Sequence, residues 1–94
     1  MSNNLMEKEV KILKALANSK RLQILDLLQR YKTPLGVGEI SREINLHFKS
    51  TSKHLQKLAE AGLVFQYRDG KWTRQKLNKK VDQLLRSIKK LIPS

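Results

Sequence analysis

The sequence predicts a mainly helical domain with one small β-hairpin (α+β), in the order α-α-α-α-β-β-α. Apolar residues recur at helical spacing along most of the chain, which indicates amphipathic helices. Two runs suited to strands flank Asp69-Gly70, a strong hairpin signal. The length of 94 residues suits one domain, and we assign residues 1–94 to it.

Three helices are expected in the first half of the chain. Residues Leu5 to Ala17 place a broad apolar stripe among lysines. Ser19 is predicted to cap a second helix, which is apolar on more than one side, as a core helix should be. The segment from Tyr31 to Gly38 is rich in proline and glycine, so it is predicted to be a loop. A short helix near Val37 to Ile44 and a turn follow.

The second half combines an amphipathic helix, the hairpin and a last helix. The helix from Phe48 to Ala61 precedes Gly62, a typical residue after a helix C-terminus. Its expected buried half consists of Phe48, Thr51, Ser52, Leu55, Leu58 and Ala59. Its outer half carries Lys49, Ser50, Lys53, Gln56, Lys57 and Glu60, with His54 at the edge. Strands over Leu63–Arg68 and Lys71–Leu77 and a helix over Asn78–Ile92 complete the order, which is that of a winged helix-turn-helix.

The positive charge of the chain is large and unevenly placed. The net charge is +12, and residues 49–80 contribute nine basic and two acidic side chains, a net of +7. Such a surface indicates a polyanionic partner, nucleic acid first and an anionic membrane surface second. The polar face of the last helix lacks the aromatic anchors of a membrane-surface helix, so no membrane partner is expected.

Composition disfavours several classes of protein. The chain has no cysteine, which removes disulfides, thiolate metal sites and thiol nucleophiles. No apolar run approaches the roughly 18 residues of a membrane span, and no secretory leader is recognisable, so we expect a cytoplasmic protein. Without a phosphate-binding glycine loop or a convergent carboxylate pair, neither an enzyme nor a cofactor is expected.

Several motifs resemble the ArsR family of bacterial and archaeal repressors. The stretch Leu16-Ala17-Asn18-Ser19-Lys20-Arg21-Leu22-Gln23-Ile24-Leu25 is similar to the family's opening motif, Leu-Ala-Asp-Pro-Thr-Arg-Leu-x-Ile-Leu. Leu46 to Leu55, followed by Leu58 and Ala61-Gly62-Leu63-Val64, resembles the family's recognition helix, and Arg68-Asp69-Gly70-Lys71 with Leu77-Asn78 resembles its wing. The resemblance covers nearly the whole chain and implies a DNA-binding winged helix-turn-helix.

Candidate DNA-binding residues lie first on the recognition helix. Ser50, Lys53 and His54 are near its start, where base edges of the major groove should be within reach. Lys49 and Lys57 are better placed for phosphates. The three lysines are four residues apart and repel each other mildly unless an anion lies across them. The alternatives are an ordinary solvated face for the lysines and a hydrogen-bonded helix residue for His54.

The predicted wing carries basic and aromatic residues. Arg68 and Lys71 flank the turn, with Arg74 beyond, which suits contact with the DNA backbone or minor groove. A two-residue turn at Asp69-Gly70 would pair Tyr67 with Trp72 and place Phe65 on the same face. An aromatic cluster that stiffens the wing is favoured over a ligand- or base-stacking platform.

The chain departs from the metal sensors of the family. Where thiol sensors carry a Cys-x-Cys-type motif, this chain has Leu35-Gly36-Val37-Gly38-Glu39, and only Asp82 stands among the ligand positions of the last helix. His47 and His54 are seven residues apart with no carboxylate cluster nearby, so no metal site is expected. His47 also stands where the family usually has a serine N-cap, which predicts a weak cap or none.

The terminal helices carry more apolar surface than a small winged domain needs to cover. The resemblance implies that they form a two-fold dimer, with Leu5, Val10, Leu13, Val81, Leu84, Leu85, Ile88 and Leu91 as candidate interface residues. The alternative is that both stripes pack within one monomer.

We therefore hypothesise a homodimeric, sequence-specific regulator of transcription that binds double-stranded DNA and represses by occluding a promoter. A non-specific architectural nucleic-acid binder and a protein-interaction module on the same scaffold are the alternatives. The sequence does not identify the operator, the regulated genes or a small-molecule effector.

Overall fold

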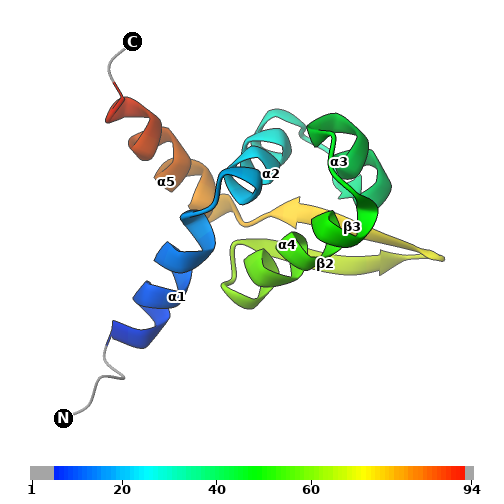
Figure 1. Cartoon of the computed structure of the whole chain (residues 1–94), viewed down its shortest axis with the longest axis horizontal. Helices are drawn as coiled ribbons and strands as arrows, with labels where there is room; N and C mark the ends of the chain where they lie inside the picture. Colours follow the sequence, from blue (N-terminus) through cyan, green and yellow to red (C-terminus); the bar gives the residue numbers. More distant parts are fainter. Residues whose placement is uncertain (1–5, 93–94) are drawn as a thin grey trace.

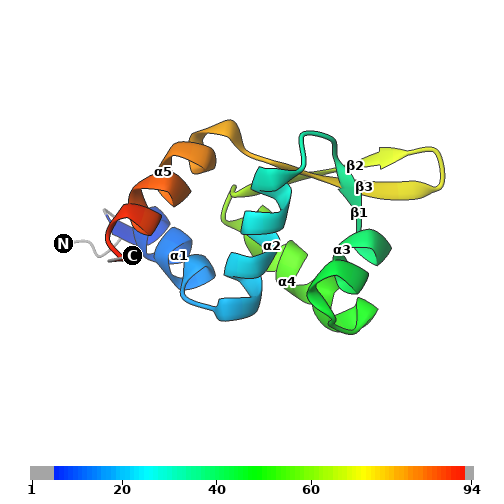
Figure 2. The same cartoon turned by 90° about the horizontal axis from the view of Figure 1, so that it is seen from above.

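Five helices and a three-stranded sheet make up residues 6–92, which are the residues that this computed structural model describes. The elements are α1 (Glu7–Leu16), α2 (Ser19–Arg30), β1 (Leu35–Gly36), α3 (Val37–Ile44), α4 (Phe48–Glu60), β2 (Val64–Asp69), β3 (Trp72–Leu77) and α5 (Lys79–Lys90). The helices α1 and α5 lie at one end of the molecule, and the tip of the β2–β3 hairpin lies at the other (Figures 1 and 2). Among the described residues, no helix is long and apolar enough to cross a bilayer.

The predicted helices are present, with one change at a helix start. Asn18, not Ser19, caps α2, because the Asn18 side chain accepts a hydrogen bond of 3.0 Å from the backbone N–H of Arg21. Asn78 caps α5 in the same way through the N–H of Lys80. Both caps satisfy N–H groups that a helix start leaves without an intrahelical partner.

The strand β1 was not predicted and lies within the expected loop. It is only two residues long and pairs antiparallel with Arg74 and Gln75 in the middle of β3, so the sheet order is β1-β3-β2. A two-residue strand shows no periodicity in sequence, and its pairing partner is about 40 residues away, so only tertiary folding reveals it.

The core is formed mainly by α2, α3 and α4. Its fully buried side chains include Ile24, Leu25, Ile40, Leu55 and Leu58. The expectation that α2 is a core helix is thus correct, although Leu22 at its start remains 38% exposed. This packing holds α3 and α4 against α2 and so fixes the direction of the outer face of α4.

The hairpin register differs from the predicted one. Asp69 is the last residue of β2 and pairs with Trp72, so the turn is Gly70-Lys71, and Tyr67 faces Arg74 rather than Trp72. Gly70 has a φ of +65° and stands first in the turn, which is the pattern of a type II′ turn. Trp72 pairs with Asp69, which is two residues after Tyr67 on β2. Because residues two apart on a strand face the same side, Phe65, Tyr67 and Trp72 still share one face of the ribbon.

Candidate nucleic-acid interface

The α3–turn–α4 unit positions the candidate site. Asn45 ends α3 in the left-handed region, with a φ of +54°. The N–H of Leu46 then donates to the Ser41 carbonyl at 3.0 Å, which closes the turn. At the start of α4, the buried Thr51 hydroxyl donates to the His47 carbonyl at 2.9 Å. These contacts hold the first turn of α4 at a defined angle to α3.

His47 occupies the N-cap position of α4, but its side chain makes no capping hydrogen bond. The backbone N–H groups of the first turn of α4 therefore lack a side-chain acceptor at this position. Unpaired N–H groups at a helix start attract anions.

The helix α4 has a buried face and a basic exposed face, as predicted. Thr51, Leu55 and Leu58 are buried, and Ala59 is partly buried. Lys49, Lys53 and Lys57 are exposed, and Ser50 is half-buried beside them. None of the three lysines forms a salt bridge with a described residue. Their charges therefore remain available to an external anion.

Two residues of the expected buried half of α4 are exposed instead. Phe48 is 61% exposed, and Ser52 is also exposed. The predicted buried face of α4 points in the correct direction but includes too many residues. The first turn of α4 is less completely covered than the turns that contain Leu55 and Leu58. Phe48 thus adds an aromatic ring to the surface at the start of α4.

Arg21 contacts His54 of the candidate site, and the sequence analysis did not predict this contact. Its Nε donates to the Ala15 carbonyl at 2.7 Å, its Nη2 donates to the Lys14 carbonyl at 3.2 Å, and its Nη1 lies 3.3 Å from Nδ1 of His54. One guanidinium therefore connects the end of α1 to α4. The motif that carries the family resemblance includes Arg21, but nothing in sequence spacing links position 21 to position 54.

His54 is half-buried within this arrangement. Because Arg21 can only donate, Nδ1 of His54 accepts the hydrogen bond and the neutral ring carries its proton on Nε2. Burial, followed by the positive charge of Arg21, lowers the pKa of His54 below its ordinary value of 6.5. Its Nδ1 is thus used inside the protein, and only the remaining part of the ring can meet a ligand.

The structure separates the three basic residues predicted on the wing. Arg68 and Lys71 are exposed near the tip of the hairpin. Arg74 is instead held between two carboxylates, at 3.3 Å from Oε1 of Glu39 and 3.5 Å from Oδ2 of Asp69. The same Glu39 oxygen accepts a hydrogen bond of 2.8 Å from the Gly36 N–H. Arg74 therefore ties the hairpin to the start of α3, which changes its expected role.

The aromatic side chains of the wing are open to solvent. Phe65, Tyr67 and Trp72 are 54%, 44% and 61% exposed. The Lys71 ammonium lies 5.7 Å from the centroid of the Trp72 ring, a cation–π distance. So much exposure argues against a closely packed cluster that stiffens the wing.

The predicted dimer residues divide into two groups. Val81 and Leu85 are each only 4% exposed, so they belong to the core of the single chain, which corrects their assignment to an interface. Val10 (44%), Leu13 (64%), Leu84 (38%) and Leu91 (81%) are exposed, and Ile88 is partly buried. Leu5 lies outside the described residues. Exposed apolar side chains thus remain on both α1 and α5, which lie at the same end of the molecule (Figure 1).

No cluster of metal-ligating side chains is found within residues 6–92. The site is instead built from a basic helix face, a helix start open to anions and a hairpin with a basic tip. The α3–turn–α4 unit and the β2–β3 hairpin that carry these features are the parts of a winged helix-turn-helix.

The chain belongs to the ArsR family of bacterial regulatory proteins. The family profile described as "Bacterial regulatory protein, arsR family" matches residues 18–65, about half of the chain. The matched segment runs from the N-cap of α2 to the start of β2 and so contains the whole helix-turn-helix.

Two curated relatives are similar in sequence. The chain is 36% identical over 80 residues to the putative arsenical resistance operon repressor ArsR of Halobacterium salinarum, and the match covers 85% of the chain and 62% of the relative. It is 46% identical over 57 residues to the transcriptional activator HlyU of Vibrio cholerae, which covers 61% of the chain and 51% of that relative. The chain thus spans less than two thirds of the length of either relative.

Solved structures share the fold over almost the whole chain. The homodimeric winged helix-turn-helix DNA-binding domain of a possible ArsR-family regulator from Mycobacterium bovis matches with a TM-score of 0.86 and 29% identity, covering 97% of this chain and 86% of that one. HlyU from Vibrio cholerae matches with a TM-score of 0.78 and 34% identity over 97% of both chains.

Proposed function

We propose that this protein is a sequence-specific regulator of transcription that binds double-stranded DNA as a homodimer. The observation that carries the proposal is the outer face of α4, where Lys49, Lys53 and Lys57 are exposed and free of salt bridges opposite a buried stripe. A helix of this kind fits the major groove, with Ser50 and Lys53 near base edges and Lys49 and Lys57 near phosphates.

Dimerisation through α1 and α5 supplies the second half of the proposed interface. Leu13 and Leu84 are exposed at the end of the molecule away from the hairpin tip, so a second copy joined there would leave both α4 helices and both wings free. Two α4 helices related by a two-fold axis would read half-sites about one helical turn apart. A regulator of this kind acts on the chromosome, so a cytoplasmic location is proposed.

Repression by occlusion of a promoter is the proposed direction of regulation. One curated relative is named a repressor and the other an activator, so family membership alone is compatible with both. Arsenic sensing does not transfer to this chain, because the 94 residues include no cysteine to supply thiolate ligands. No catalytic step is proposed.

Selection of bound fragments from a random DNA pool tests the proposal. We expect enrichment of a pseudo-palindrome, with an affinity that falls steeply as salt increases because phosphate contacts release counterions. Equal competition by random duplex would favour a non-specific architectural binder. An absence of any salt-dependent DNA binding would favour a protein-interaction module instead.

A further inference from the structure

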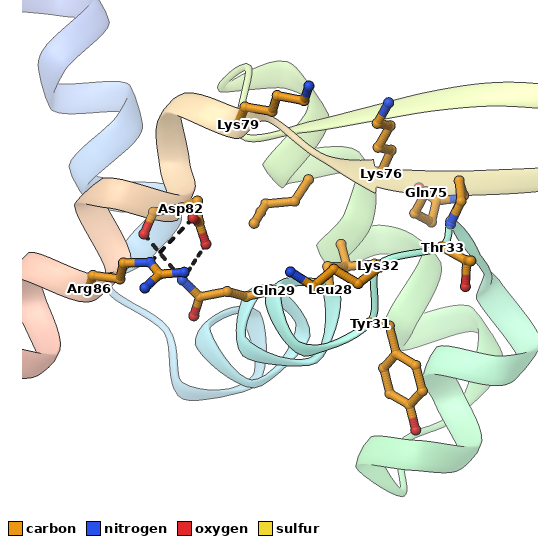
Figure 3. Close-up of a pocket in the computed structure, with 12 residues that line it drawn as sticks. Leu28, Gln29, Tyr31, Lys32, Thr33, Gln75, Lys76, Lys79, Asp82 and Arg86 are labelled. Carbon is orange, nitrogen blue, oxygen red and sulfur yellow. Dashed lines mark hydrogen bonds and ion pairs between the residues drawn. The ribbon is translucent and has the colours of Figure 1, made fainter.

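One face of the hairpin, which we call the aromatic face, carries three exposed aromatic side chains, those of Phe65, Tyr67 and Trp72. This face points away from the core, because Val64 and Gln75 are buried on the opposite side of the same strands. Figure 3 shows the alternation on β3, where the side chain of Lys76 points away from that of Gln75. The helices α2, α3 and α4 lie on the core side of the sheet (Figure 2). Clusters of exposed apolar side chains mark interaction sites, so the aromatic face is a candidate docking surface.

The charge of the aromatic face is positive. Lys76 projects from the same side of β3, and the Lys71 ammonium lies 5.7 Å from the centroid of the Trp72 ring. Neither lysine forms a salt bridge with a described residue. The carboxylate of Asp69, on this face, is already paired with Arg74 at 3.5 Å. The face therefore combines aromatic rings with available cations, which complements a partner that has flat rings and negative charge.

The spacing of the three rings favours bases that are separated from one another. Phe65 and Tyr67 are two residues apart on β2, which places them roughly 7 Å apart. Trp72 is a diagonal neighbour of Tyr67 on β3, at roughly 7–8 Å. Successive bases in a duplex are only about 3.4 Å apart along one strand, so they could stack on these rings only after the strand is extended. Sheets that bind single strands stack about two or three bases on aromatic side chains in this way.

The position of the aromatic face favours DNA as the source of those bases. The hairpin lies beside α4, and its tip is at the opposite end of the molecule from α1 and α5 (Figure 1). A second copy joined through α1 and α5 would therefore leave the face open. A strand that separates next to a duplex bound by α4 would lie close to this face.

We propose that the aromatic face binds single-stranded DNA by stacking unpaired bases on Phe65, Tyr67 and Trp72, while Lys71 and Lys76 contact the phosphates. The binding is additional to the duplex recognition proposed for α4. The choice of DNA over RNA rests on the proposed function, whereas the stacking of bases does not.

Fluorescence titration of the whole chain tests the stacking, because Trp72 is the single tryptophan and lies within the face. The probes are oligothymidylate of about ten nucleotides, within the usual site size of single-strand binders, and an abasic strand of the same length. The abasic strand carries the same phosphates without bases. We expect saturable quenching of Trp72 by oligothymidylate, and binding of the abasic strand that is about tenfold or more weaker and without quenching.

A double variant separates the rings from the charges. F65A/Y67A keeps Trp72 and both lysines, and it should weaken oligothymidylate binding about tenfold or more because two stacking contacts are lost. Its affinity for the selected duplex should be retained. The matched control Tyr31→Ala removes a ring that is 43% exposed, against 44% for Tyr67. Tyr31 lies beside α3 rather than on the hairpin, so this control should bind as the unaltered chain does (Figure 3).

Four results would overturn the proposal. Equal binding of the abasic strand and oligothymidylate would leave electrostatic attraction alone. Equal oligothymidylate binding by the unaltered chain and F65A/Y67A, with both folded by circular dichroism, would leave an acidic protein segment as the partner of the face. An equal loss of affinity for the selected duplex in F65A/Y67A would assign the face to the duplex interface, and tighter binding of oligouridylate than of oligothymidylate would assign it to RNA. The single-strand titrations use no duplex, so the two proposals fail separately.

Discussion

Arg21 is the residue through which the end of α1 contacts the helix proposed to read DNA. Its guanidinium bonds to the carbonyls of Lys14 and Ala15 and to the imidazole of His54. A hydrogen bond to a neutral acceptor of this kind contributes about 1 kcal/mol, and more when the donor is charged. Protonation of Nδ1 removes the acceptor, so the hydrogen bond between Arg21 and His54 forms only with the neutral ring.

Acidification should destabilise the protein through His54. Its pKa is lowered in the folded chain, so between that value and 6.5 the unfolded chain binds more protons than the folded one. Stability should consequently rise with pH across this window and be lost as the pH falls through it. Urea unfolding at pH 7.5 and 5.5 measures the loss.

His54→Gln should flatten this pH dependence, because glutamine can accept from Arg21 without titrating. His47→Gln, at an exposed position whose side chain makes no capping bond, is the matched control and should leave the dependence as it is. The same pH dependence in all three proteins would contradict the assignment.

Lys53 should contribute directly to specific DNA binding. It is exposed on α4 and forms no salt bridge with a described residue, so Lys53→Ala removes a contact without disturbing the fold. We expect specific binding to weaken by about 1–3 kcal/mol, measured by fluorescence anisotropy with the selected duplex. Lys90→Gln serves as the control, and unchanged affinity in Lys53→Ala would remove Lys53 from the interface.

At the scale of elements, the end of α4 depends on one glycine. Gly62 has a φ of +76°, the N–H of Gly62 bonds to the Ala59 carbonyl, and the N–H of Leu63 bonds to the Leu58 carbonyl. This pair of bonds is a Schellman motif. It ends α4 and directs the chain toward β2, the first strand of the hairpin.

Alanine at the two glycines Gly62 and Gly38 should have opposite effects. A Cβ at Gly62 meets nothing within 4 Å, so the cost of Gly62→Ala is the left-handed backbone alone, about 1–2 kcal/mol. Gly38 lies inside α3 with its nearest neighbour at 3.7 Å, so Gly38→Ala should stabilise by about 0.5–1 kcal/mol. Chemical denaturation measures both, and effects of the same sign would contradict this account.

Trp72 provides an optical test of the wing. It is the single tryptophan of the chain and is 61% exposed beside the hairpin turn. If the wing contacts DNA, the selected duplex should change the Trp72 emission at saturation. A spectrum unaffected by saturating duplex would place the hairpin outside the interface.

At the scale of the whole molecule, the exposed leucines on the terminal helices form the proposed dimer interface. Leu13→Glu should convert a dimer to a monomer, because a carboxylate would be buried at the interface without a counter-charge. Sedimentation analysis measures the mass, and DNA affinity should fall with it. Phe65→Glu, an equally exposed apolar position on the hairpin, should leave the oligomeric state unchanged. A Leu13→Glu protein with the mass of the unaltered chain would exclude α1 from the interface.

The sequence by itself determined the helices, the hairpin and the basic face of α4. These features depend on periodicity and turn chemistry within a few residues, which local sequence encodes directly. Lys49, Lys53 and Lys57 could be placed on one face because helix geometry alone relates residues four apart.

Only the tertiary structure decided the contacts between distant segments. The pairing of β1 with β3, the hairpin register, the Arg74 carboxylate pairs and the Arg21–His54 contact all join residues that no local period relates. Burial also reassigned Val81 and Leu85 from the interface to the core, because a stripe on a helix wheel does not say which neighbour covers it. Packing within the single chain settles that choice: Val81 and Leu85 join its core, whereas Leu13 on α1 and Leu84 on α5 remain exposed.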